Sequence, residues 1–567
     1  MEALKTKIAQ NIVSMYPQGT LDTDGVKDLF DSTPDLKMGD FTLACFKLAK
    51  VLRNAPNRIA DQLCQNLAGI LPELEKVESV NGYLNFFVSD TYKIAGMQAV
   101  DALGREYGKN QDGQGKTMCI DYSSPNIAKP FHIGHLGTTV IGNSIKRLFS
   151  FSGYHCVGIN HLGDWGTQFG KLIVAYKLWG DEEKIQTDGV NELARIYKKF
   201  FDEAQLDSSL DDRAREEFAK MEQGDEENLR IWQWFKDISL DGKFMNIYRL
   251  LGIEFESYAG ESFYNDKMDA VVEELKDKQL LVESEGAQIV DLDAYGMPPC
   301  IILKKDGSTL YATRDITAAL YRKNTYNFDE CIYVTDAGQS LHFKQWFKVI
   351  GLMGYDWEKQ LVHVPYGKIS INGQKLASRT GNVVLLEDLF ADAVSRVKKI
   401  IEEKNPDREN KEQIAQSVGI GAVIFNQLSA GRIKDVNFVW EDALNFDGNT
   451  GPYAQYTFAR TCSVLEKAGE IASVDTAMAL SDHEKTLIDL LYKFPAKVRQ
   501  ARLDYEPSTI TRYILDVCQS FNRFYHDCPI LKADKATKAL RVMLCRITRN
   551  VLDNALWLIG LDRPEKI

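Results

Sequence analysis

Residues 121–135 read DYSSPNIAKPFHIGH, a stretch that follows a short apolar run and leads into a predicted helix. A strand that runs into a helix N-terminus is a natural anion site, because free N–H groups and the helix dipole point at the ligand. His132 and His135 are three residues apart, so they share one face of the first helical turn. Gly134 between them leaves space for a flat ring to approach the backbone. The stretch therefore predicts a site that holds a nucleotide and stabilises the charge on its phosphates.

Two other interpretations of the histidine pair stay open on these residues alone. A metal site would need a third or fourth protein ligand, and the predicted helix carries no Cys or carboxylate at ligand spacing. The two imidazoles could also be hydrogen-bonded groups at a helix start that take no part in chemistry. The residues on either side of the pair favour the nucleotide site, and we expect no protein metal site.

The bulk composition is that of an ordinary globular protein with several domains. The chain has 567 residues, of which 44% are hydrophobic and 26% charged, which suits roughly three or four domains. It holds no run of about 18 apolar residues, so no membrane span is expected, and the opening MEALK resembles neither a signal nor a transit peptide. The ten cysteines are scattered without a Cys-x-x-Cys pair, which favours reduced thiols. We therefore expect a cytoplasmic enzyme without structural metal.

Residues 1–110 are predicted to form a small α+β domain. Amphipathic helices are expected at about 2–16 and 41–53. A strand-like run follows at 80–88, within which Gly82 marks a turn or a bulge.

From residue 111 to about 410, strand-like apolar runs alternate with helical segments, a pattern that predicts a parallel sheet in an α/β domain. The long polar stretch 181–260 reads as helices inserted between the two halves of that sheet. Strand signals are absent after residue 410 and helical periodicity continues, which predicts an all-α bundle at 411–567. The predicted strands of the sheet are 117–122, 154–160, 288–292, 300–304, 330–335 and 361–364.

The tetrapeptide His-Ile-Gly-His at 132–135 is the signature of class I aminoacyl-tRNA synthetases and related nucleotidylyltransferases. Together with HLGDWGTQFG at 161–170, the block at 121–135 resembles the arginyl-tRNA synthetases. The resemblance implies a Rossmann-type catalytic domain at 111–410, an α+β N-terminal domain that contacts the tRNA elbow, and an all-α anticodon-binding bundle. It also implies that ATP activates L-arginine to arginyl-adenylate and that the arginyl group passes to the 3′ end of tRNA(Arg). Activation would require tRNA, and no protein nucleophile is involved.

A second resemblance lies at 373–382, GQKLASRTGN, which is similar to the Lys-Met-Ser-Lys-Ser loop of class I synthetases. Lys375 fits that loop, whereas Ser378 stands where the second lysine would be. Activation builds negative charge on the phosphates, so a replacement cation is expected. Arg379 or Lys129 could supply it, and arginyl enzymes commonly carry a lysine at the position of Lys129. The resemblance assigns catalysis to His132, His135, Lys129, Lys375, Ser378 and Arg379, and ATP binding to His132, Gly134, His135 and Lys375.

The amino-acid pocket should contain acceptors for a guanidinium, which offers five donors in a planar fork. Tyr311 and Asp315 are four residues apart, on one face if the segment opens a helix. Asp315 could then pair with the fork while Tyr311 closes over it. Without the resemblance, Asp315 would read as a surface carboxylate. The family pattern assigns arginine binding to Asp121, Asn126, Tyr311, Asp315 and Gln339, with Asp121 and Asn126 on the α-amino group.

Contacts to tRNA are expected at both ends of the chain. Residues 82–87, GYLNFF, resemble the domain that contacts the tRNA elbow, and residues 448–456, GNTGPYAQY, resemble the anticodon-binding bundle. Aromatic side chains four apart on a helix can stack on splayed bases, although such side chains are more often part of a core. The residues predicted to bind tRNA are Asn85, Phe86, Tyr453, Arg460, Phe521 and Tyr525.

The net charge of −12 does not exclude a tRNA partner, because affinity depends on local basic surface. Residues 201–230 hold 11 acidic and 4 basic side chains, whereas residues 441–567 hold 17 of each. The acid is thus concentrated in the insertion, away from the predicted anticodon-binding bundle.

One residue departs from the family pattern: Gly137 stands where arginine is usual. Together with Ser378, it keeps open the alternative of a tRNA-binding module that has lost catalysis. A cysteinyl enzyme would need zinc-binding cysteines, which are absent, and a small-molecule nucleotidylyltransferase would not need the helical tail. The expected partners are L-arginine, tRNA(Arg) and ATP with Mg2+, for which no dedicated protein site is predicted. We expect a monomer.

Overall fold

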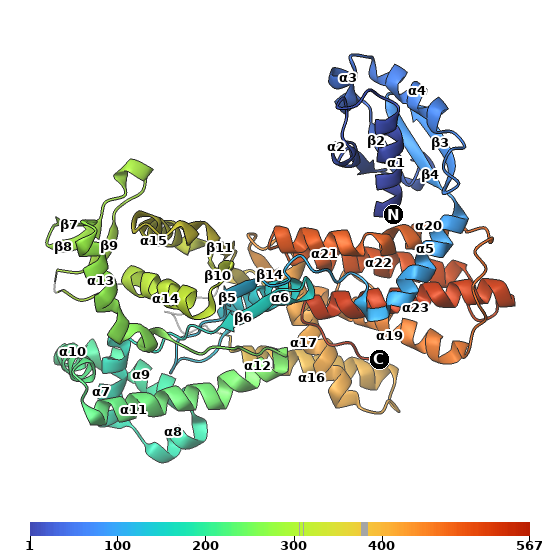
Figure 1. Ribbon diagram of the computed structural model, residues 1–567. Coiled ribbons are helices and arrows are strands. Elements are labelled where there is room, and N and C mark those ends of the chain that lie inside the picture. The colour runs from blue at the N-terminus through green and yellow to red at the C-terminus, as the bar shows by residue number, and fades with distance from the viewer. Residues whose placement is uncertain (306, 310, 376–383) are drawn as a thin grey trace.

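The structure, a computed structural model, describes residues 1–305, 307–309, 311–375 and 384–567. A small N-terminal unit, a central parallel sheet with its helices, and a C-terminal helical bundle follow one another along the chain (Figure 1). None of the helices in these ranges is long and apolar enough to cross a membrane. All ten cysteines carry free thiols.

The N-terminal unit packs helices against an antiparallel sheet with the strand order β1-β2-β4-β3. Strands β3 and β4 form a hairpin whose two turn residues, Asn81 and Gly82, both have positive φ, as a two-residue hairpin turn requires. Helix α5 then leads away from the unit toward the bundle (Figure 1). The elements are α1 (Glu2–Ser14), α2 (Thr23–Lys27), β1 (Phe30–Ser32), β2 (Phe41–Ala44), α3 (Phe46–Leu52), α4 (Pro56–Leu67), β3 (Leu74–Val80), β4 (Tyr83–Val88) and α5 (Asp90–Leu103).

The helix predicted over 41–53 is wrong at its start, because residues 41–44 form strand β2. Phe41 and Leu43 are buried and pair with Phe86 and Leu84 of β4. Pairing with a strand that is distant in sequence overrides the local helical pattern, and the helix begins only at Phe46.

The central sheet is parallel throughout, with the order β11-β10-β5-β6, which confirms the predicted parallel α/β sheet. From β5 the chain crosses to β6 at one edge of the sheet, and from β10 it crosses to β11 at the other edge. A ligand site is expected at such a switch point, beyond the carboxyl ends of the strands. The elements are β5 (Thr117–Asp121), α6 (Leu136–Phe151), β6 (His155–Ile159), α14 (Tyr311–Tyr326), β10 (Glu330–Asp336), α15 (Ser340–Leu352) and β11 (Leu361–Tyr366).

Two of the predicted strands do not belong to this sheet. The runs predicted at 288–292 and 300–304 form β8 (Ala287–Val290) and β9 (Cys300–Leu303), which pair with β7 (Leu281–Ser284) in a separate antiparallel sheet. The connection between β8 and β9 is too short for the helical crossover that parallel strands need. Apolar runs of this length do not by themselves distinguish the two arrangements.

The polar stretch between β6 and this antiparallel sheet is helical, as predicted. A π-helical segment (Ile238–Phe244) joins the long helix at Glu226–Asp237 to the short helix at Met245–Leu251. The helices are α7 (Thr167–Trp179), α8 (Glu182–Asp188), α9 (Val190–Ala204), α10 (Ser209–Glu222), α11 (Glu226–Asp237), α12 (Met245–Leu251) and α13 (Met268–Asp277).

The C-terminal part is a helical bundle, but the prediction that strands end at residue 410 is wrong in one place. A short strand, β14 (Val436–Phe438), pairs in parallel with β12 (Ile369–Ile371), which also pairs with β13 (Gln374–Lys375). Three residues are too few to show a strand period in the sequence. The helices are α16 (Leu386–Lys404), α17 (Lys411–Ser429), α18 (Trp440–Ala443), α19 (Gly451–Ala468), α20 (Asp482–Tyr492), α21 (Phe494–Leu503), α22 (Ser508–Asp527) and α23 (Lys535–Leu558).

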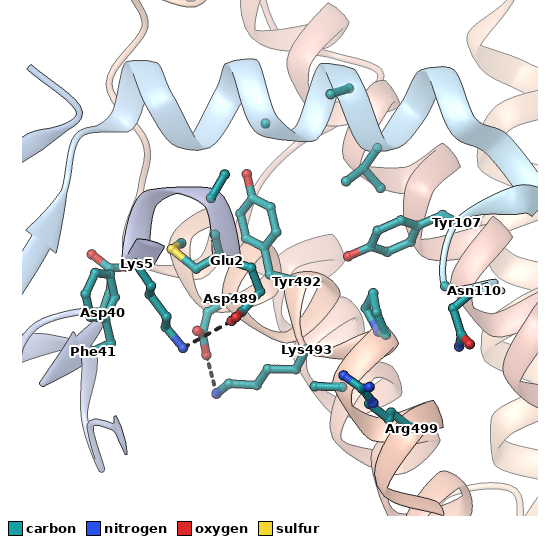
Figure 2. Close-up of a pocket in the computed structure, with 18 of the residues that line it drawn as sticks. Glu2, Lys5, Asp40, Phe41, Tyr107, Asn110, Asp489, Tyr492, Lys493 and Arg499 are labelled. Carbon is teal, nitrogen blue, oxygen red and sulfur yellow. Dashed lines mark hydrogen bonds and ion pairs between the residues drawn. The ribbon is translucent and has the colours of Figure 1, made fainter. Parts of the chain in front are cut away.

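A crevice of about 770 Å³ separates the N-terminal unit from the bundle beside α5 (Figure 2). Its walls come from α1, α5, α20 and α21 and are largely apolar, with the ring of Tyr492 among them. Charged groups at the crevice pair with each other: Glu2 with Lys5 at 3.4 Å, and Asp489 with Lys493 at 2.6 Å.

Helix α6 joins the sheet and the bundle in one hydrophobic core. It packs against the sheet on one side and against α17, α21 and α23 on the other, so it is buried over nearly its whole length. The helix therefore carries the 132–135 signature on a rigid support between the two parts.

Candidate functional site

The two histidines lie at the start of α6, in a 3₁₀ turn (Ile133–His135) that precedes the helix. Their rings face each other with centroids 3.9 Å apart. The backbone N–H of Gly134 donates to His132 Nδ1 at 3.1 Å, and that of His132 donates to His135 Nδ1 at 3.2 Å. Since both Nδ1 atoms accept, the protons of the neutral rings lie on Nε2.

Both imidazoles are neutral at neutral pH. Burial, and then the charge of His132, lowers the pKa of His135 to about 3. Burial, and then the charge of Lys129, lowers the pKa of His132 as well. The pair therefore offers two Nε2–H donors to an anion rather than two positive charges. Burial also lowers the pKa of Lys129, which is half-buried in the same loop.

The loop between β5 and the histidines holds three non-glycine residues in left-handed conformations, Ser123 (φ 71°), Ser124 (φ 48°) and Ala128 (φ 58°). Each such residue costs about 1–2 kcal/mol, so the loop must be held by its surroundings. The N–H of Ser124 donates to Asn160 Oδ1 at 3.1 Å, and the N–H of Ala128 donates to Ser239 Oγ at 2.8 Å. The strained loop is thus held by the side chain of Asn160, which follows β6, and by that of Ser239 in the π-helical segment.

A cavity of about 490 Å³ opens at the carboxyl ends of β5 and β10, at the switch point of the sheet. It brings together residues from the strained loop, the start of α6, the start of α14 and the turn before α15. Among its lining residues are six that the sequence singled out: Asp121, Asn126, His135, Tyr311, Asp315 and Gln339.

Asp121 lies at the end of β5 and is buried. Its Oδ2 is 2.8 Å from Arg322 Nη2, a guanidinium that is itself buried, and its Oδ1 accepts a hydrogen bond from Ser124 Oγ at 2.9 Å. Asn126 follows in the loop and packs against the backbone at Gly163, where a Cβ would lie 1.9 Å from Asn126 Oδ1. A side chain at 163 would therefore displace the Asn126 amide from this position.

Tyr311 and Asp315 lie in the first turns of α14, as the spacing predicted. The Asp315 carboxylate is 2.6 Å from His342 Nε2 and keeps about a quarter of its side chain exposed, at 26%. Tyr311 is 67% exposed at the mouth of the cavity, so its ring is free to fold over a bound molecule.

The sequence reasoning missed Glu261 and His161, which line this cavity, and the buried Arg322, which pairs with Asp121. Burial raises the pKa of Glu261 to about 7, although Arg314 lies 3.7 Å away. His161 Nδ1 lies 3.2 Å from the carbonyl oxygen of Ala259. His161 belongs to the quoted block 161–170, which was a usable signal, whereas Glu261 begins a 3₁₀ helix (Glu261–Lys267) that no sequence pattern marked.

The residues that follow the second nucleotide signal (373–382) lie beside the histidine stretch. The N–H of Ile133 donates to the carbonyl of Val384 at 3.1 Å, and the N–H of Leu386 donates to that of Phe131 at 3.0 Å. The backbone of Lys375 lies upstream, in β13. Ser378 and Arg379 lie outside the described residues. In the described ranges, no group of three or more His, Cys, Asp or Glu is arranged to hold a metal ion.

Gly137 lies where the ring of Tyr366 fills the space that a side chain would need. A Cβ at this position would lie 2.9 Å from the Tyr366 ring. The departure from arginine therefore matches a tyrosine on β11 that occupies the same place and also lines the cavity.

A second polar surface lies on α19 and α22. The Arg460 guanidinium lies over the rings of Tyr456 (5.0 Å) and Tyr525 (5.3 Å), and it donates to the Asn522 amide oxygen. The Asn522 amide in turn donates to the Tyr453 hydroxyl at 3.0 Å. Tyr456 and Tyr525 are 40% and 43% exposed. The surface thus presents two open aromatic faces and a cation.

Three of the predicted tRNA contacts need correction. Phe86 is fully buried and its ring stacks on Phe41 at 5.0 Å, inside the N-terminal core. Asn85 is buried too and accepts a hydrogen bond from Thr42 Oγ1 at 2.7 Å. Phe521 is fully buried in the bundle. Phe86 and Phe521 point into the cores that their strand and helix cover, whereas Asn85 lies on the opposite face of β4 and is held there by Thr42.

Three family models match the chain. The model described as tRNA synthetases class I (R), catalytic domain, matches residues 97–440. Those of the arginyl tRNA synthetase N terminal domain and the DALR anticodon binding domain match residues 2–88 and 454–567.

Curated relatives and solved structures agree with these matches. An arginine–tRNA ligase of Alkaliphilus metalliredigens is 53% identical over 544 residues, which cover 95% of this chain and 96% of the relative. That of Clostridioides difficile is 47% identical over 551 residues, covering 96% and 97%. The structure of Thermus thermophilus arginyl-tRNA synthetase matches with a TM-score of 0.82 at 24% identity, covering 100% of this chain and 99% of that one. The Plasmodium falciparum structure matches with a TM-score of 0.80 at 24% identity, covering 100% and 98%. At this identity the two structures show a shared fold.

Proposed function

This chain belongs to the arginyl-tRNA synthetase family, and from that premise we propose how its own residues activate arginine and hold tRNA. The resemblance at residues 121–135 and 161–170 is confirmed by the family matches, as are the fold class and the ligase activity. Arginine and tRNA are therefore its partners. ATP as the second substrate, with Mg2+ bound to its phosphates, is part of the proposal.

In the first step, a carboxylate oxygen of arginine attacks the α-phosphorus of ATP. The bond from that phosphorus to the bridging oxygen of the leaving group breaks, which gives arginyl-adenylate and pyrophosphate. A ribose hydroxyl at the 3′ end of tRNA then attacks the arginyl carbonyl, its proton is lost, and AMP leaves. Neither step needs a nucleophile from the protein, so catalysis is a matter of position and electrostatics.

We assign the α-ammonium group of arginine to Asp121 and Asn126 and the guanidinium to Asp315, Tyr311 and Gln339. The observation that carries the proposal is the single cavity that gathers these five residues beside His135. Such a cavity rejects uncharged rivals, because they would desolvate the Asp315 carboxylate without supplying the positive charge of a guanidinium.

The phosphates would meet His132 and His135 through their Nε2–H groups. Gly134 lets the His132 ring lie close to the backbone, because a Cβ at 134 would lie 2.8 Å from that ring. Lys129 supplies positive charge from the same loop. Lys375, Ser378 and Arg379 belong to the second nucleotide signal at 373–382. Val384, two residues after that signal, pairs with the histidine stretch, which supports a role on the same phosphates. A magnesium ion would arrive with the nucleotide and offset part of its charge.

We propose that tRNA binds at two surfaces. The anticodon would meet the rings and the cation of α19 and α22, where Tyr453, Arg460 and Tyr525 lie. Stacking of bases on exposed aromatic rings is the usual means of holding single-stranded RNA. The tRNA elbow would meet the N-terminal unit near Asn85 and Phe86, where the exposed rings of Phe46 and Tyr83 lie edge to face at 5.3 Å.

The proposal also covers the domain boundaries, the oligomeric state and the cellular compartment. The N-terminal domain would span 1–110, the catalytic domain 111–410 and the anticodon-binding domain 411–567. We propose a monomer. The free thiols support the reducing cytoplasm.

The test is pyrophosphate exchange into ATP with each of the twenty amino acids, with and without total tRNA. The proposal expects exchange with arginine alone, and only when tRNA is present. Exchange with another amino acid would refute the assignment of Tyr311, Asp315 and Gln339. Exchange with arginine in the absence of tRNA would refute tRNA-dependent activation while leaving the pocket assignment intact.

A further inference from the structure

Tyr248, in α12, lies beneath the strained loop of the active site and does not reach the surface. It is fully buried, and its hydroxyl oxygen lies 2.8 Å from Ser123 Oγ and 2.9 Å from Asn160 Nδ2. The residue comes from the end of the helical insertion, which no motif in the sequence connects with the active site.

The Tyr248 hydroxyl is the second member of a chain of hydrogen bonds that ends at a signature histidine. Ser123 Oγ lies 2.9 Å from Thr139 Oγ1, and Thr139 Oγ1 donates to the carbonyl of His135 at 2.6 Å. One assignment of protons satisfies every member: Asn160 donates to Tyr248, Tyr248 to Ser123, Ser123 to Thr139, and Thr139 to His135. Each hydroxyl then donates once and accepts once.

The same chain holds the two left-handed serines of the loop. Ser123 is bound through its side chain to Tyr248 and through its N–H to Thr138 Oγ1 at 3.0 Å. Ser124 is bound through its N–H to Asn160 Oδ1, and the amide of Asn160 is fixed by the Tyr248 hydroxyl. Residues in this conformation relax unless their surroundings over-determine them. Loss of one hydroxyl would therefore loosen the turn that lies between Asp121 and Asn126.

We propose that Tyr248 is a positioning residue for arginine activation. Its hydroxyl keeps the Ser123–Ser124 turn in register with the first turn of α6, so that the arginine-binding groups and the histidines face one bound pair of substrates. The role of those groups rests on the function proposed above, whereas the hold on the turn does not. Tyr248 itself touches no substrate in this arrangement.

The variant Tyr248→Phe removes the hydroxyl and keeps the ring. The ring packs edge to face against Phe131 and Phe255, with centroids 5.8 Å and 5.1 Å away, and a phenylalanine would keep both contacts. A matched control is Tyr513→Phe in α22, another buried tyrosine, whose hydroxyl donates to the Leu490 carbonyl at 2.9 Å. Both variants lose one buried hydroxyl, so a purely structural role predicts the same behaviour for both.

The first readout is steady-state exchange of pyrophosphate with arginine and tRNA, measured well below the melting temperature of each variant. Tyr248→Phe is expected to lower kcat by about 10- to 100-fold, because small displacements of binding groups cost rates of that order. Tyr513→Phe is expected to leave kcat unchanged at a similar shift in Tm. Thr139→Val removes the hydrogen bonds of Thr139 to Ser123 and to the His135 carbonyl, and it is expected to lower kcat by a similar factor. Equal kcat values for the two tyrosine variants would overturn the proposal.

The second readout is hydrogen exchange of peptides that cover residues 117–131. Their amides should exchange about tenfold faster in Tyr248→Phe than in the wild type, and at the wild-type rate in Tyr513→Phe. If the wild type shows no exchange of pyrophosphate, the proposed function fails, and the amide rates still decide the role of Tyr248. Unchanged amide rates in Tyr248→Phe would refute that role.

Discussion

The substitution Asp315→Asn tests whether this carboxylate selects arginine. The change keeps the size of the side chain and removes its charge, and the amide can still meet His342, which lies 2.6 Å from the carboxylate in the wild type. The pocket would then offer a neutral group to the guanidinium. The fold should be unaffected, because the side chain lies at the cavity and not in a core.

The magnitude follows from the exposure of the carboxylate. A hydrogen bond to a charged group contributes about 1.5–3 kcal/mol, and 1.36 kcal/mol is a factor of ten. These values give a loss of about 10- to 150-fold, and solvent screening places the expected effect toward the lower end, because 26% of the Asp315 side chain is exposed. The guanidinium lies away from the reacting carboxylate of arginine, so the loss should appear in KM for arginine, with kcat and KM for ATP little changed.

The assay is tRNA-dependent exchange of pyrophosphate with arginine and with citrulline, its uncharged analogue. The preference for arginine should fall by the same factor as kcat/KM. The control is Asp489→Asn in the bundle, whose carboxylate is 23% exposed and lies 2.6 Å from Lys493. An unchanged KM for arginine in Asp315→Asn, or an equal rise in Asp489→Asn, would refute the assignment of Asp315.

Three further predictions concern charge, pH and tRNA. The variant Lys129→Met should lower kcat of activation by about 100-fold while KM for arginine stays the same, as measured by the same exchange assay, because the charge acts on the phosphates. The pKa of His135 is about 3 in the folded protein and 6.5 in the unfolded chain, so its contribution to the free energy of unfolding is lost as pH falls from 6.5 toward 3. Between pH 8 and pH 5.5, the free energy of unfolding measured in urea should therefore fall by about 1.4 kcal/mol more in the wild type than in His135→Asn. In filter binding, Tyr525→Ala should weaken tRNA by about 1–3 kcal/mol, whereas Phe521→Leu should lower Tm and leave the affinity for tRNA unchanged.

The sequence was most informative where local order and chemistry coincide. A strand, a turn rich in small residues and a helix start follow one another within residues 117–135, so the position of the histidines could be predicted without tertiary information. The spacing of Tyr311 and Asp315 likewise predicted their shared place at the start of α14. The identification of the family came from the quoted motifs and not from composition, which fits many globular enzymes.

What the sequence did not reveal depends on partners that are distant along the chain. Residues 41–44 carry a helical pattern and become a strand because β4 pairs with them. Phe86 and Tyr83 stand in one aromatic run, yet only the pairing of the sheet decides that Phe86 faces the core and Tyr83 the solvent. Glu261 and Tyr248 enter the active site through loops and helices of the insertion, where no local period points to them.

The burial of α6 determines which fragments of this protein would keep their hydrophobic core covered. The core around α6 includes side chains from the parallel sheet and from the bundle, whereas the N-terminal core is built from residues 4–88 alone. A fragment cut before the bundle would turn the buried side of α6 toward water and would be prone to aggregate. Residues 1–88, in contrast, have a hydrophobic core of their own, whereas α5 packs into the core around α6. The catalytic sheet and the bundle therefore share one core and cannot be separated. A substitution that changes anticodon recognition on the bundle must leave this core intact, because the core also supports the catalytic site.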